Sequence, residues 1–85
     1  MWFEHNFEKY KVWNYSYFGP DGSGGYHTAI KIIKYKRSKH YDGQIFAQEC
    51  SWKHKHEISG CDLDIIKLKC IVVAKDLGWK IKSLT

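Results

Sequence analysis

The dipeptide Asp42-Gly43 is the feature that most constrains how this chain can fold. Both central positions of a tight two-residue hairpin turn need positive φ, which Gly adopts freely and Asp tolerates. A turn at this point places Ile33 opposite Trp52 on one face and Lys36 opposite Glu49 on the other. One apolar face and one face with an opposite-charge pair are what a half-buried antiparallel sheet needs. The sequence therefore predicts a hairpin centred on Asp42-Gly43.

The size and composition of the chain predict one domain, residues 1–85, with an aromatic core. A chain of 85 residues buries only about 60–65% of its unfolded surface, so a few large side chains must supply the stability. Four Trp, six Tyr and four Phe can do so. The N-terminus lacks the charged and apolar regions of a signal peptide, and no apolar run reaches membrane-spanning length. Three cysteines cannot all pair within the chain, which favours a reducing, cytoplasmic location.

The apolar pattern predicts an α+β fold, an antiparallel β-meander of three to four strands with one C-terminal helix packed on one face. After an irregular lead, the expected elements are strands Phe7–Phe18, Tyr26–Arg37 and Gln44–His56, the helix Asp62–Leu77 and a short edge strand Trp79–Lys82. A single alternation cannot bury both Ile30 and Ile33 in the second strand, so we expect a β-bulge near Ile32-Ile33. A helix starting at Thr28 is the alternative.

The expected helix carries more apolar surface than one sheet can cover. Ser59 to Asp62 has capping-box spacing, and Gly78 is the expected stop. A main stripe faces the sheet and consists of Leu63, Ile66, Cys70, Val73, Ala74 and Leu77. A second stripe consists of Ile65, Leu68 and Val72. This second stripe must be covered by the N-terminal segment with Trp2 and Phe3, or by another molecule.

No catalytic, cofactor or metal motif is apparent in the sequence. Cys50, His54, His56 and Cys61 are potential zinc ligands, but their spacing lacks the short Cys-x2-Cys or His-x3-His pairs of structural zinc sites. The nine carboxylates are scattered, without a pair spaced for acid–base chemistry. We therefore expect no metal, no cofactor and no enzymatic activity.

The net charge of +5 suggests a second kind of contact surface. Seven cationic residues fall on the second and third expected strands: Lys31, Lys34, Lys36, Arg37, Lys39, Lys53 and Lys55. The expected register directs Lys34 and Lys36 outward, where a lysine patch could contact phosphates. A merely solvated face is the alternative. With a single Arg in the chain, sequence-specific reading of DNA is not expected.

A partial resemblance connects the chain with one nucleic-acid-binding family. Gly19-Pro20-Asp21 before a strand that begins Tyr26-His27-Thr28, followed by a lysine-bearing helix, resembles the double-stranded RNA-binding domain. The chain departs from that family where Gly22 stands in place of its loop histidine. It departs again where Asp62-Leu63-Asp64 stands in place of the basic pair of its last helix. Too little chain precedes Phe7 for its first helix, so the family is not assigned.

Two functional hypotheses follow for a small binding protein without a catalytic motif. The first is an inhibitor or adaptor that docks on a host protein or nucleoprotein complex, or that pairs as a homodimer. In kind, such a chain resembles phage and mobile-element proteins that block host defence, including anti-CRISPR proteins. Its expected contact residues are Trp13, Tyr15, Tyr17, Ile65, Leu68 and Val72. The second hypothesis is a non-sequence-specific RNA- or DNA-binding domain that uses the lysine patch.

Overall fold

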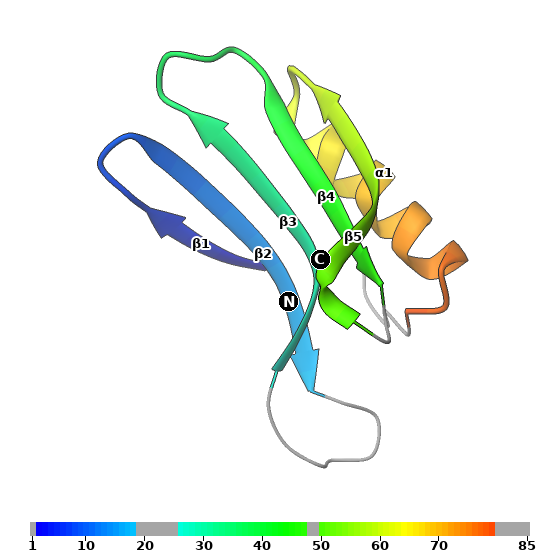
Figure 1. The fold of residues 1–85 in the computed structure, drawn as a ribbon. Coiled ribbons are helices and arrows are strands. Elements are labelled where there is room, and N and C mark those ends of the chain that lie inside the picture. The colour runs from blue at the N-terminus through cyan, green and yellow to red at the C-terminus, as the bar shows by residue number, and fades with distance from the viewer. Residues whose placement is uncertain (1, 19–25, 48–49, 80–85) are drawn as a thin grey trace.

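The computed structural model describes residues 2–18, 26–47 and 50–79, with only the backbone described for 16–18, 26–27, 47 and 50–55. Five strands form one antiparallel sheet in the order β1-β2-β3-β4-β5, and one helix packs on it (Figure 1). The elements are β1 (Trp2–Asn6), β2 (Tyr10–Phe18), β3 (Tyr26–Tyr35), β4 (Tyr41–Ala47), β5 (Cys50–Gly60) and α1 (Leu63–Asp76). The expected α+β meander with a C-terminal helix is confirmed, with five strands in place of three or four.

The predicted hairpin at Asp42-Gly43 is wrong, because both residues lie inside β4. Gly43 pairs with Ile32 of β3 and with Ile58 of β5, so it stands in the middle of the sheet. A Cβ atom on Gly43 would lie 2.8 Å from the Sγ of Cys70 on α1. The glycine therefore serves close packing of the helix on the sheet, and its φ is not positive.

The turn between β3 and β4 lies instead at residues 36–40. The backbone N–H of Ser38 donates to the carbonyl oxygen of Tyr35 at 3.0 Å and closes this turn. The predicted strand Gln44–His56 is consequently two strands, β4 and β5, that pair with each other. At the N-terminus, the expected irregular lead is the edge strand β1. Trp79 is not in a strand, and the rest of the expected strand Trp79–Lys82 lies outside the described residues.

A β-bulge is present in β3, although it lies nearer the start of the strand than expected. Tyr15 of β2 pairs with Ile30, whereas the next residue, Ser16, pairs with Thr28. Ala29 is therefore the extra residue, and both Ala29 and Ile30 are fully buried. After the bulge, Ile32 and not Ile33 faces the helix, which reverses the faces that the expected hairpin had assigned to this strand.

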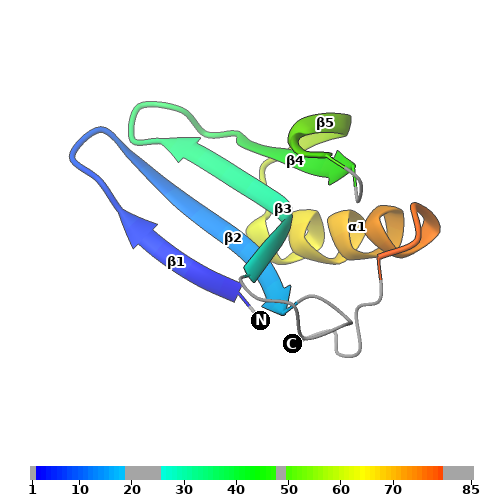
Figure 2. The ribbon, with the colours of Figure 1, turned by 60° about the horizontal axis from the view of Figure 1, so that its bottom comes forward.

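The core lies between α1 and the face of β3, β4 and β5 that the helix covers (Figure 2). From the helix it contains Ile66, Cys70, Ile71 and Ala74. Trp79 follows the helix and is buried too, and its indole N–H donates to the backbone oxygen of Phe46 at 2.8 Å.

The helix ends agree with the sequence prediction, Asp62–Leu77. Asp62 is the N-cap, and its side chain accepts the backbone N–H of Ile65 at 3.2 Å, which makes the cap Asp62 itself and not Ser59. Leu77 is the C-cap, and Gly78 follows with a φ of 97°. Glycine suits that left-handed conformation, as expected for a helix stop.

Candidate nucleic-acid interface

Two turns meet at one end of the sheet (Figure 1). The β1–β2 turn, residues 7–9, and the β3–β4 turn, residues 36–40, share this end because successive antiparallel strands reverse direction. The backbone N–H of Lys36 donates a hydrogen bond to the backbone oxygen of Lys9 at 3.1 Å. Side chains from distant parts of the sequence are thereby fixed next to each other.

Cationic side chains are concentrated at these two turns. We call the following set the basic end: Lys9, Lys11, Lys34, Lys36, Arg37 and Lys39. Carboxylates at the same end belong to Glu4, Glu8 and Asp42. Glu4 is already engaged, since its Oε1 lies 3.3 Å from Lys11 Nζ and accepts the indole N–H of Trp13 at 3.0 Å. Six cations against three carboxylates give this end a net positive charge. Neither Lys34 nor Lys36 has a carboxylate partner among the described residues.

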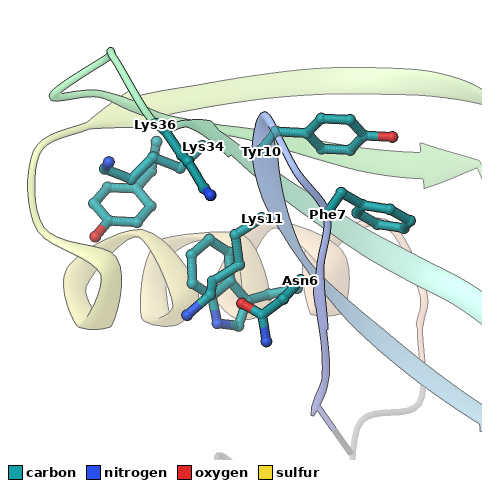
Figure 3. Close-up of a pocket in the computed structure, with 8 residues that line it drawn as sticks. Asn6, Phe7, Tyr10, Lys11, Lys34 and Lys36 are labelled. Atoms are coloured by element: carbon teal, nitrogen blue, oxygen red, sulfur yellow. The ribbon is translucent and has the colours of Figure 1, made fainter.

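A hollow of about 300 Å³ opens on the helix side of the basic end (Figure 3). It is lined by Asn6, Phe7, Tyr10, Lys11, Trp13, Lys34, Lys36 and Tyr41. Lys34 Nζ lies 5.8 Å from the centre of the Tyr41 ring, and Lys11 Nζ lies 5.6 Å from the centre of the Trp13 ring. Cations held over aromatic faces are a feature of sites that bind both phosphate and rings.

Lys11 and Lys34 are direct cross-strand partners in this hollow. Like charges placed opposite each other in an antiparallel pair are destabilising. Glu4 offsets the charge of Lys11 alone. An anion bound between the two lysines would remove the remaining repulsion.

A second groove, of about 500 Å³, lies beside Tyr35 between the two turns. Its lining residues are Glu8, Lys9, Tyr35, Lys36 and Arg37. Lys36 therefore borders both the groove and the hollow.

Three aromatic rings cross this end of the sheet, and we call them the aromatic row: Phe7, Tyr10 and Tyr35. The rings of Phe7 and Tyr10 are stacked, with centroids 4.8 Å apart and planes at 22°. Tyr10 and Tyr35 follow with centroids 5.7 Å apart. The outer members are exposed, Phe7 by 48% and Tyr35 by 54%. Large exposed rings beside cations are characteristic of nucleic-acid interfaces.

The cationic residues expected from the sequence divide between several places. Lys31 lies on the sheet face away from the helix, next to Asn14 and Gln44. Lys34 lies on the helix side and not on the outer face, because it continues the alternation of the buried Ile30 and Ile32 and the hairpin register that predicted otherwise is wrong. Arg37 and Lys39 are exposed in the β3–β4 turn. The side chains of Lys53 and Lys55 lie outside the described residues.

The expected aromatic contact surface on β2 is corrected by the structure. Trp13 and Tyr15 are only 6% and 3% exposed, because their side of β2 is the helix side and belongs to the core. The centre of the Trp2 ring lies 5.2 Å from that of Tyr15 in an edge-to-face contact. The side chain of Tyr17 lies outside the described residues. Trp13 and Tyr15 therefore cannot present a contact surface without opening the core.

The second helix stripe, for which the sequence left two possible covers open, is about half exposed. Ile65, Leu68 and Val72 are 49%, 49% and 56% exposed. Trp2 does not cover them; its ring instead lies 5.2 Å from Lys67 Nζ.

Sequence reasoning did not identify Phe7, Lys9, Tyr10, Lys11, Tyr35 and Tyr41 as members of the site. They become neighbours only through the β1–β2 hairpin and the turn at 36–40. The charged clusters Glu8-Lys9 and Lys36 to His40 were the signal that could have located both turns.

Potential metal-ligating side chains are dispersed in the part of the chain that the structure describes. No group of three or more His, Cys, Asp or Glu side chains there could hold a metal ion. Cys61 Sγ lies 3.4 Å from His40 Nδ1, and both residues are exposed. The side chains of Cys50 and His54 are not among those described. Within the same ranges, no helix is long and apolar enough to cross a membrane.

Comparisons with protein-family models, with curated proteins and with solved structures found no significant match to this chain.

Proposed function

We propose that this protein is a non-enzymatic nucleic-acid-binding protein that holds its ligand at the basic end. The observation that carries the proposal is the hydrogen bond that joins the two turns, because it gathers six cationic side chains around exposed aromatic rings. Lysine-rich surfaces bind phosphates through charge and release counterions, which makes affinity high at low salt. Lysines lack the planar fork that reads base edges, so we expect little sequence preference.

The experiment compares two charge reversals of equal size by fluorescence anisotropy with labelled oligonucleotides. Lys36→Glu with Arg37→Glu changes the basic end, whereas Lys69→Glu with Lys75→Glu changes two exposed helix positions. We expect the first variant to weaken binding at low salt by roughly tenfold or more and to flatten the salt dependence. The second variant should keep most of the affinity. Equal losses in both variants would show that only net charge matters.

A second candidate function is docking on a protein or nucleoprotein complex, as an inhibitor or adaptor, through Ile65, Leu68 and Val72. The favouring observation is that these three apolar side chains remain about half exposed on α1. Exposed apolar stripes of this kind are common in helix-in-groove contacts. The stripe is small, so a stable interface would also require contacts outside it.

Leu68→Asp tests this second candidate, with Lys75→Asp as the matched control on the same helix. Leu68 is 49% exposed, so Leu68→Asp should retain the helical circular dichroism signal of the native protein. Partner proteins retained by the native chain and by Lys75→Asp should be lost with Leu68→Asp. A variant that unfolds would instead show that Leu68 stabilises the core.

A further inference from the structure

We infer that the basic end binds single-stranded nucleic acid, with a base stacked on Tyr35 and the adjoining phosphates held by Lys34 and Lys36. The inference rests on the proposed function and adds the form of the ligand and the way it is held. DNA and RNA share this chemistry and are separate arms of the test below.

The aromatic row makes a single strand the fitting ligand. Tyr10 lies between Phe7 and Tyr35, so the row ends in two rings that are each about half exposed. In a duplex the base faces are stacked inside, whereas a single strand presents them to a protein. Stacking does not depend on which base is present, which agrees with the shortage of Arg.

Cationic side chains line the groove beside Tyr35, next to the position proposed for the stacked base. Lys9, Lys36 and Arg37 line it, with Glu8 as the one carboxylate among its described lining residues. Its volume of about 500 Å³ lies within the usual range of ligand sites, roughly 300–1,000 Å³. A base on Tyr35 would therefore bring its own phosphate within reach of these three side chains.

The hollow on the other side of Lys36 could hold the following phosphate of the same nucleic-acid strand. Lys34 and Lys36 line this hollow and have no carboxylate partner among the described residues. Lys34 also faces Lys11 across the β2–β3 pair, and a phosphate would relieve that repulsion. Tyr35 and Lys34 lie on opposite faces of the sheet, because the Tyr10–Tyr35 and Lys11–Lys34 pairs follow each other along β2 and β3. Lys36 borders both the groove and the hollow, so one strand could pass round the end of the sheet from the first to the second.

The test measures binding of three labelled DNA ligands of equal length: a single strand, the matching duplex and an abasic single strand. The single strand is also tested as RNA. Native protein, Tyr35→Ala, Tyr35→Phe and Lys36→Glu with Arg37→Glu are compared at low salt. We expect the native protein to prefer the single strand. Tyr35→Ala should lose roughly tenfold or more of that affinity and little of the duplex affinity, and Tyr35→Phe should restore it.

The abasic strand keeps the test decisive even if Tyr35→Ala fails to fold, because it needs only native protein. It carries the same phosphates without bases, so we expect it to bind several-fold more weakly than the normal strand. Equal binding of abasic strand, single strand and duplex, with loss only in Lys36→Glu/Arg37→Glu, would overturn the inference and leave the proposed function standing. Absence of binding to every oligonucleotide would overturn both.

Discussion

A Cβ atom on Gly43 would lie 2.8 Å from the Sγ of Cys70 and 3.0 Å from the backbone oxygen of Ile58. No Cβ atom normally approaches other atoms so closely, so α1 can pack on β4 only because residue 43 has no side chain. The same glycine is what made Asp42-Gly43 resemble a turn. Glycine is needed at position 43 because it has no side chain, and not because of its conformational freedom, since its φ is not positive.

Gly43→Ala should lower the free energy of unfolding by about 1–3 kcal/mol, because either the helix or the neighbouring strand must shift. The measurement is the urea midpoint with its slope. Gly60→Ala is the matched control, since a Cβ there would meet only side-chain atoms of Ile66 and no backbone atom. When Cys70 is also replaced by Ala, Gly43→Ala should lower the free energy of unfolding by a smaller amount. An equal loss in both backgrounds would show that the close contact with the backbone oxygen of Ile58 causes the destabilisation.

Trp79→Phe should destabilise the protein by about 1–3 kcal/mol. The substitution removes the indole N–H that donates to the backbone oxygen of Phe46 in a buried place, and that oxygen then loses this bond. Trp2→Phe is the control, because Trp2 is only partly buried at the sheet edge. Thermal unfolding followed by circular dichroism measures both, and equal midpoints for the two variants would contradict the prediction.

Stability should fall at alkaline pH through the thiol of Cys70. Burial raises the pKa of this thiol from 9.0 to about 11, because the thiolate would lose its hydration. The unfolded chain therefore releases the proton at lower pH than the folded protein, so the contribution is complete below pH 9 and is lost as pH rises toward 11. Burial raises the pKa of Tyr15 as well, which acts in the same direction.

Cys70→Ala isolates the part of this effect that belongs to the thiol. The variant is expected to be less stable at neutral pH and to lose less stability than the native protein between pH 9 and pH 11. Urea unfolding at a series of pH values provides the comparison. Parallel pH curves for the two proteins would exclude Cys70 as the source.

Lys34→Gln should stabilise the free protein while it weakens nucleic-acid binding. Removal of one of two cross-strand lysines relieves a repulsion worth about 0.2–1 kcal/mol, and the gain should fade at high salt. Lys69→Gln, an exposed lysine on the helix, is the control for a simple change in net charge. A Lys34→Gln variant that is less stable at low salt would show that the contact with the Tyr41 ring outweighs the repulsion.

The sequence predicted the extent of the helix best, because helical periodicity and a glycine stop are local signals. The helix lies within the expected bounds and Gly78 follows it as expected, whereas the N-cap is Asp62 and not Ser59. The helical period also places Leu68 outside the main stripe, in agreement with its exposure. The strands were harder, because Asp42-Gly43 is locally a better turn than the segment Lys36 to His40. The structure places Gly43 inside β4, where it packs under Cys70, and that contact joins residues far apart in sequence.

The candidate site could be predicted only in part for the same reason. Lys34, Lys36, Arg37 and Lys39 were identified as cations, but the expected hairpin directed Lys34 to the wrong face of the sheet and placed the other three in a strand instead of the β3–β4 turn. The aromatic row joins the β1–β2 hairpin to β3, and no local pattern shows that Tyr35 and Tyr10 are partners.

The strand order β1-β2-β3-β4-β5 has a consequence for how the chain reaches this structure. Each strand pairs with its sequence neighbour, so the sheet can grow by successive hairpin closures with short loops, a topology associated with rapid folding. The helix that covers β3, β4 and β5 comes last in the described chain. During synthesis the apolar face of these strands would therefore remain uncovered until α1 has been made. A sheet with an uncovered apolar face is prone to aggregate.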